Sequence, residues 1–176
     1  MKLYIARHGE TAWNAENLVC GRTDLPLTER GMEQARLLAE NAVGKGIEVI
    51  IASPLLRARQ TAQAVSDAIG VPIQIDDRLV EFDFGSLDGT SRFGEEFQWL
   101  RAQMPTRFPG GESGFDLAYR VYSLLYEIKE KYADRNVLLV CHNCVSRMVR
   151  SFFMNMTIEE YGNYHAPNAQ LVEYEM

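Results

Sequence analysis

Short apolar runs alternate with longer amphipathic stretches along most of this chain of 176 residues. Residues 2–7 and 48–53 have the length and composition of buried strands, and each is followed by a stretch with helical spacing. A chain in which strands alternate with helices favours a parallel α/β sheet with helices on both faces. Ligands of such proteins bind beyond the carboxyl ends of the strands, so functional residues are expected there.

The predicted elements continue this alternation to the end of the chain. Strands are predicted at 2–7, 48–53, 71–76, 136–141 and 169–175, and helices at 29–43, 54–69, 93–103, 114–132 and 144–154. Thr28 is a suitable N-cap for the first of these helices, and Gly70 a suitable end for the second. The last strand is expected at a sheet edge. No repeat or linker divides the chain, so one domain over 1–176 is predicted.

The composition excludes several classes of function. The formal net charge is −6, which disfavours a broad nucleic-acid-binding face but permits a local anion pocket. No apolar run has membrane-spanning length, and the four apolar residues before Arg7 are too few for a signal peptide. Three cysteines in a chain of this size indicate a reducing cytoplasm.

Polar side chains gather at the predicted carboxyl ends of the strands. Arg7 and His8 end the first strand, and His142 follows the fourth. Arg57 lies in the first turn of the helix after the second strand, and Glu81 in the loop after the third. Arginine forks bind phosphate, histidine can be a neutral nucleophile, and a carboxylic acid can protonate a leaving oxygen. The set suffices for phosphoryl transfer without a metal. The sequence also lacks an acidic cluster for Mg²⁺ and a Walker A pattern.

With these residues the chain resembles the histidine phosphatase superfamily, also called the phosphoglycerate mutase-like family. The matching blocks are RHGET at 7–11, GRTDLPLTERGMEQA at 21–35, SPLLRARQTA at 53–62, LVEFDFGSLDG at 79–89, PGGES at 109–113 with Arg120, and VLLVCH at 137–142. The resemblance implies a three-layer α/β/α fold whose mostly parallel sheet has one antiparallel edge strand. It also implies a phosphatase that needs no cofactor and acts on small phosphate monoesters.

The resemblance further implies a role for each of the five residues at the strand ends. His8 would attack phosphorus and form a phosphohistidine. Arg7, Arg57 and His142 would bind the equatorial oxygens of the transferred group. Glu81 would protonate the leaving oxygen and then deprotonate the hydrolytic water.

Three further residues are candidates for contacts to phosphate or substrate. They are Asn14, Arg22 and Asn143, the last through its backbone N–H. Arg22 has an alternative role in a structural ion pair. Asn143 and Cys144 stand where relatives commonly have two glycines, and this departure leaves the identity of the substrate open.

The main alternative within the family is a cofactor-dependent mutase. We favour a phosphatase, because the chain is short and has few lysines. Only Arg92, Arg101 and Arg107 lie between Asp88 and Pro109 to hold a second phosphate. A non-enzymatic relative is disfavoured because the predicted nucleophile and acid are both present. No feature of the sequence predicts an oligomeric state.

The segment VCHNCVSR at 140–147 permits two other enzymatic interpretations. Cys141 and Cys144 have the spacing of a thiol oxidoreductase, and Cys141 and Arg147 that of a cysteine phosphatase. Only one predicted strand follows the cysteine pair, whereas thioredoxin-like folds place it early. The loop between Cys141 and Arg147 lacks the glycine of a tight phosphate cradle. Arg147 is therefore expected to face solvent or an acidic neighbour.

Two features near the predicted site remain ambiguous. The aromatic residues of segment 90–110 would either form a lid over the pocket or pack the segment down; they are Phe93, Phe97, Trp99 and Phe108. His165 is expected to be a structural or surface residue.

Overall fold

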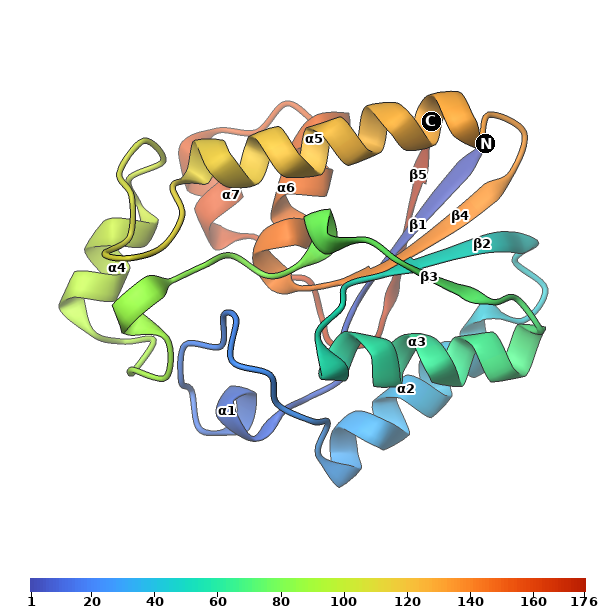
Figure 1. Ribbon diagram of the computed structural model, residues 1–176, viewed down its shortest axis with the longest axis horizontal. Coiled ribbons are helices and arrows are strands. Elements are labelled where there is room, and N and C mark those ends of the chain that lie inside the picture. Colours follow the sequence, from blue (N-terminus) through green and yellow to red (C-terminus); the bar gives the residue numbers. More distant parts are fainter.

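A computed structural model describes residues 1–176 and contains one five-stranded sheet of order β3-β2-β4-β1-β5 (Figure 1). The strands are β1 (Lys2–Arg7), β2 (Ile47–Ala52), β3 (Ile73–Ile75), β4 (Asn136–Cys141) and β5 (Leu171–Glu175). The first four are mutually parallel, and β5 runs antiparallel to β1 at the edge. The predicted sheet, including its antiparallel edge strand, is confirmed.

Helices cover both faces of the sheet (Figure 1). They are α1 (Ala12–Ala15), α2 (Glu29–Ala42), α3 (Leu56–Ile69), α4 (Glu95–Arg101), α5 (Gly114–Lys131), α6 (Asn143–Phe153) and α7 (Ile158–Asn163). Alternate residues of β1 separate the two cores. Tyr4 packs in a cluster with α2 and α3, whereas Leu3 and Ile5 pack in a cluster with α5 and α6. The three-layer arrangement therefore follows from strands that are apolar on both sides.

The helix ends agree with the capping signals in the sequence. Thr28 caps α2 by accepting a hydrogen bond from the N–H of Gly31, and α3 ends at Gly70 in the left-handed conformation (φ 72°). Ser113 and Asp116 form a capping box at the start of α5. These local signals place the helix boundaries close to their predicted positions.

The short elements were harder to predict. The strand predicted at 71–76 is only three residues long, and the helices α1 and α7 were not predicted. The single-turn 3-10 helices Asp77–Leu79 and Gly85–Leu87 were also not predicted. Thr11 and Thr157 begin α1 and α7 with capping boxes, which are too local to create a readable apolar period.

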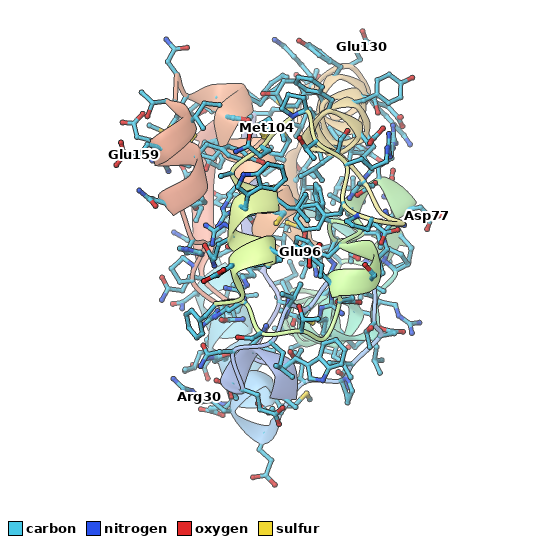
Figure 2. The ribbon with its side chains drawn as sticks, turned by 90° about the vertical axis from the view of Figure 1, so that its left-hand side faces the viewer. Arg30, Asp77, Glu96, Met104, Glu130 and Glu159 are labelled. Carbon is cyan, nitrogen blue, oxygen red and sulfur yellow. The ribbon has the colours of Figure 1, made fainter.

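No helix is both long and apolar enough to cross a membrane. The short helices α1 and α4 lie beyond the carboxyl ends of the parallel strands, on the left of Figure 1. Figure 2 looks onto this end of the molecule, where α4 with Glu96 stands in front. Candidate functional residues are expected behind it, at the ends of β1 and β4.

Candidate active site

His8 is a buried histidine at the carboxyl end of β1, with 3% of its surface exposed. Its Nδ1 lies 2.6 Å from the carbonyl oxygen of Gly9. Because a carbonyl only accepts, Nδ1 carries the proton and Nε2 keeps its lone pair. Burial, and then the charges of Arg57 and Arg7, lower the pKa of His8 well below its ordinary value. His8 is therefore a neutral imidazole whose Nε2 is unprotonated.

His142 lies next to His8 because β1 and β4 are adjacent and parallel. Arg7 pairs with Cys141 in the register of these strands, and the two imidazole centroids are 5.1 Å apart. The Nε2 of His142 lies 2.7 Å from the hydroxyl of Ser53, whereas its buried Nδ1 has no partner. Burial, followed by the charge of Arg57, lowers the pKa of His142 well below its usual range.

Arg57 lies fully buried behind His8, at the start of α3. Its Nε donates to Nε2 of His8 at 3.3 Å, and its terminal nitrogens donate to the carbonyl oxygens of Gly21 (2.6 Å) and Thr23 (2.9 Å). Asp88 holds that loop by accepting from the backbone N–H groups of Gly21 and Thr23. The orientation of the guanidinium is thus fixed by backbone groups.

Arg7 supplies a second buried nitrogen that has no partner. Its Nη1 donates to the carbonyl oxygen of Ala166 at 3.1 Å, but its Nε is buried without a hydrogen bond. The only buried side-chain nitrogens or oxygens in the structure without a partner are this Nε and Nδ1 of His142. Such groups are costly unless a ligand satisfies them. A bound oxyanion would satisfy the N–H of Arg7, and also Nδ1 of His142 in the tautomer in which that nitrogen carries the proton.

Glu81 is a carboxylate that lines the same cavity as Arg7 and His8, and it is the only carboxylate in the lining. It is 4% exposed. Its Oε1 accepts from the N–H of Phe82 at 2.8 Å, and its Oε2 from the N–H of Cys144 at 3.2 Å, in the first turn of α6. These two N–H groups fix the orientation of the carboxyl group. We call Arg7, His8, Arg57, Glu81 and His142 the inner site.

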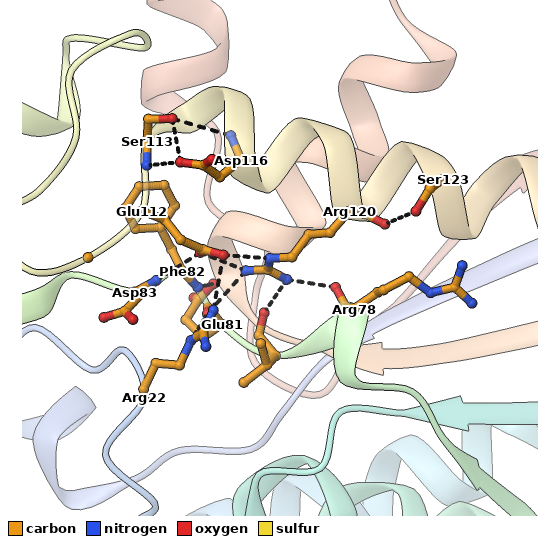
Figure 3. A network of polar contacts seen from close by, with 12 residues as sticks. Arg22, Arg78, Glu81, Phe82, Asp83, Glu112, Ser113, Asp116, Arg120 and Ser123 are labelled. Atoms are coloured by element: carbon orange, nitrogen blue, oxygen red, sulfur yellow. Dashed lines mark hydrogen bonds and ion pairs between the residues drawn. The ribbon is translucent and has the colours of Figure 1, made fainter.

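The backbone of Glu81 is held by a polar network that Figure 3 shows. Arg22 and Arg120 both donate to the Glu81 carbonyl oxygen, at 3.1 and 3.2 Å. Glu112 accepts from both arginines and from the N–H of Asp83. The PGGES segment and Arg120 therefore fix the loop that carries the carboxylate.

The three other candidates occupy different places. Asn14 and Asn143 line a cavity of about 100 Å³ together with Arg7, His8 and Glu81. The side-chain oxygen of Asn14 accepts from the N–H of Thr11, and that of Asn143 from the N–H of Ala166. Each amide nitrogen is left for a ligand. Arg22 does not line this cavity; its guanidinium forms an ion pair with Glu112.

Four basic side chains that line the cavity were not among the predicted site residues. Two of them, Arg92 and Arg101, were candidates for holding a second phosphate in a mutase. We call all four the outer cluster: Arg92, Arg101, Arg147 and His165. The prediction that Arg147 faces solvent or an acidic neighbour was wrong. It is 6% exposed and donates to the carbonyl oxygen of Tyr164 (2.6 Å) and to Nδ1 of His165 (3.3 Å). Its position four residues after Asn143, on the same helix face, was the available signal.

The cysteines of the VCHNCVSR segment do not have reactive surroundings. Cys141 and Cys144 are free, and burial raises the pKa of each to about 12. Both thiols stay protonated at neutral pH, whereas nucleophilic and redox chemistry needs the thiolate. No group of three or more His, Cys, Asp or Glu side chains is arranged to hold a metal ion.

Comparison with known proteins gives consistent matches. The sequence profile of the histidine phosphatase superfamily (branch 1) matches residues 3–176. Proteins named probable phosphoglycerate mutase GpmB are 42% identical in Enterobacter sp. (strain 638) and 41% in Yersinia pestis (strain Pestoides F). Each alignment covers 81% of this chain and 69% of the relative.

Solved structures with a similar fold align with almost the whole of this chain. The alpha-ribazole phosphatase from Shigella flexneri has a TM-score of 0.87 and 25% identity, over 100% of this chain and 91% of that one. A mycobacterial glucosyl-3-phosphoglycerate phosphatase has a TM-score of 0.86 and 25% identity, over 98% and 88%.

Proposed function

The chain belongs to the histidine phosphatase superfamily and is an enzyme of that type, and we propose that it hydrolyses small phosphate monoesters through a phosphohistidine on His8. One observation carries the proposal. His8 presents an unprotonated Nε2, and two buried side-chain nitrogens that lack partners, Nε of Arg7 and Nδ1 of His142, lie on its own strand and on the neighbouring strand end. With the Ser53 hydroxyl donating to Nε2 of His142, Nδ1 of His142 carries the proton and both nitrogens are donors. A phosphoryl group at this position would satisfy both donors and meet the nucleophile at once.

In the first step, Nε2 of His8 attacks phosphorus and the bond to the leaving oxygen breaks. Arg7, Arg57 and His142 stabilise the charge on the equatorial oxygens, so side chains supply the positive charge that a metal supplies in other phosphatases. Glu81, in its protonated form, gives its proton to the leaving oxygen. The products are an alcohol and a phosphohistidine.

In the second step, the Glu81 carboxylate takes a proton from water as the water oxygen attacks phosphorus. The P–N bond breaks, its electron pair returns to Nε2 of His8, and inorganic phosphate is released. The Phe82 and Cys144 N–H groups hold the carboxylate in place during both steps. Arg22, Arg120 and Glu112 position this loop without contacting the substrate.

A mutase is the second candidate, because the relatives at 41–42% identity are named probable phosphoglycerate mutases. The proposal for a phosphatase rests on the solved structures named as phosphatases, which match nearly the whole chain. A ³¹P NMR time course with 3-phosphoglycerate separates the two functions. Release of inorganic phosphate supports a phosphatase, whereas conversion to 2-phosphoglycerate without release supports a mutase.

The direct test is hydrolysis of p-nitrophenyl phosphate with and without a metal chelator. We expect turnover that the chelator does not change, loss of activity in His8→Ala, and full activity in Arg59→Gln, a change at an exposed position of α3. Activity that requires an added metal, or that survives in His8→Ala, would contradict the proposal.

A further inference from the structure

The cavity that contains His8 and Glu81 has a large excess of positive charge. Four arginines line it, namely Arg7, Arg92, Arg101 and Arg147, whereas Glu81 is its only carboxylate. Arg7 belongs to the inner site. Arg57 also belongs to it and donates a hydrogen bond to His8. With Glu81 protonated, as the first step requires, a phosphate monoester dianion balances the charge of these two arginines. The three arginines of the outer cluster remain without a negative partner.

No ion pair in the structure involves an arginine of the outer cluster. Arg101 donates to the carbonyl oxygen of Gly162 at 2.6 Å, and Arg92 donates to the side-chain oxygen of Asn17. Glu159 borders a neighbouring surface cavity with Arg101 but makes no ion pair with it. These guanidinium groups are held in place by neutral oxygens, so their charge remains available to a ligand.

Arg147 is the strongest sign of a missing anion. It is 94% buried, since only 6% of its surface is exposed, and its partners are the neutral Tyr164 carbonyl and His165. A buried guanidinium without a counterion is costly, and an anion bound in the cavity would offset that cost. A residue with only a structural role would be expected to have a carboxylate partner at this depth.

His165 adds a neutral donor to the three arginines. Its Nδ1 accepts from Arg147, so the proton of the neutral ring lies on Nε2. His165 is exposed on one side, and its partial desolvation, followed by the charges of Arg147 and Arg101, lowers its pKa to about 4. At neutral pH the ring is therefore uncharged, and its Nε2–H can donate to a ligand in the cavity.

We propose that the outer cluster binds a second anionic group of the substrate, so that the preferred substrates are phosphate monoesters that also carry a carboxylate or a second phosphoryl group. This inference rests on the proposed function, which places the reacting phosphoryl group at His8. Carboxylates and phosphoryl groups share the planar or multidentate oxygen geometry that guanidinium forks recognise. An ester with an uncharged leaving group would leave the outer cluster unused.

Binding of unreactive analogues tests the inference separately from catalysis. Calorimetry would compare alkylphosphonates with ω-phosphonocarboxylates and ω-bisphosphonates of two to four carbons. We expect the best second-anion analogue to bind at least about tenfold more tightly than the alkylphosphonate of equal length, because a hydrogen bond to a charged group contributes about 1.5–3 kcal/mol. The ratio between the carboxylate and phosphonate arms identifies which anion fits.

Variants of the outer cluster assign the preference to these residues. Arg101→Gln and His165→Gln should each reduce the preference by about three- to tenfold or more, and Arg147→Gln by more, after its fold has been checked by circular dichroism. Arg59→Gln removes the same charge from an exposed helix position and should leave the preference unchanged. The inference is overturned if no second-anion analogue is preferred, or if the preference persists in all three variants.

Hydrolysis of the matching phosphate esters separates failure of this inference from failure of the proposed function. If all esters are hydrolysed with equal kcat/KM, the second-anion site is refuted and the phosphatase function stands. If no ester is hydrolysed but the binding preference depends on the outer cluster, the site stands and the proposed function fails.

Discussion

The inner site and the outer cluster hold their anion-binding groups in different ways. Arg57 and His142 of the inner site are fully buried and lie on or directly after rigid elements, where backbone groups fix Arg57. In the outer cluster Arg92 is exposed, Arg101 is half-buried on α4, and His165 lies in the loop before β5. Fixed groups suit a reaction whose geometry must be exact to a fraction of an ångström. Groups on loops and short helices suit recognition of the variable part of a substrate.

The difference predicts two patterns of mutational effect. A change in the inner site should slow every substrate, whereas a change in the outer cluster should depend on the charge of the leaving group.

Replacement of the nucleophile should have the largest effect. His8→Ala removes the group that forms the covalent intermediate, so kcat should fall by roughly four orders of magnitude or more with aryl and alkyl phosphates alike. Steady-state release of phosphate measures this. Cys141→Ser is the control and should retain most of the activity. If Cys141→Ser lost activity and His8→Ala kept it, the cysteine phosphatase interpretation would replace the present account.

Removal of the proton donor should have the next largest effect, and it should depend on the leaving group. Glu81→Gln should lower kcat/KM for alkyl phosphates by about 10²–10⁴-fold, because this ratio reports formation of the phosphohistidine and an alkoxide departs poorly without a proton. p-Nitrophenyl phosphate has a good leaving group and should be much less affected in its first step. Equal losses of kcat/KM with both substrates would show that Glu81 does not act as the acid.

Loss of the network behind Glu81 should produce a weaker form of the same pattern. Arg120→Ala removes the bonds to Glu112 and to the Glu81 carbonyl oxygen, so the carboxylate should lose its fixed position. We expect kcat for alkyl phosphates to fall by about tenfold and the ratio of alkyl to aryl rates to fall with it. A purely structural role for Arg120 would lower both rates together and leave that ratio unchanged.

The smallest predicted effect concerns stability at mildly acidic pH. The folded-state pKa values of His8 and His142 are lowered, so the unfolded chain binds protons that the folded chain does not. Stability is therefore complete above about pH 6.5 and decreases as pH falls below it, by up to about 1.4 kcal/mol per pH unit for each histidine. Urea unfolding at pH 7 and pH 5.5 measures the decrease. His142→Gln should show a smaller pH dependence, and an unchanged dependence would refute this origin.

Much of the inner site could be predicted from sequence because its residues are tied to strand ends. The alternation of strands and helices predicts a parallel sheet whose carboxyl ends share one edge, so Arg7, His8 and His142 were expected at that edge. Their contact then follows from the β1–β4 register. Capping residues such as Thr28 also predicted helix boundaries, because a cap acts on the helix that directly follows it.

The outer cluster and the network behind Glu81 depend on contacts between distant segments. Arg147 was misjudged because nothing in its neighbourhood reveals that the loop bearing Tyr164 and His165 covers it. The pairing of Glu112 with Arg22 likewise joins residues 90 positions apart. Such contacts are set by tertiary packing and leave no periodic signal in the sequence.

The packing role predicted for the aromatic residues of segment 90–110 is confirmed for two of the four. Phe97 and Phe108 are buried in an aromatic cluster with Phe84, whereas Phe93 and Trp99 are exposed. Packing explains the first two, and whether the exposed pair closes over a substrate stays a prediction.

The most direct test of the account is chemical trapping of the intermediate. The enzyme would be mixed with a ³²P-labelled monoester, quenched in alkali within milliseconds, and analysed for phosphate bound to peptides. The account predicts label that is stable in alkali, labile in acid and confined to His8, with none in His8→Ala. Label on Cys141 or Cys144, or turnover without any phosphohistidine, would contradict it.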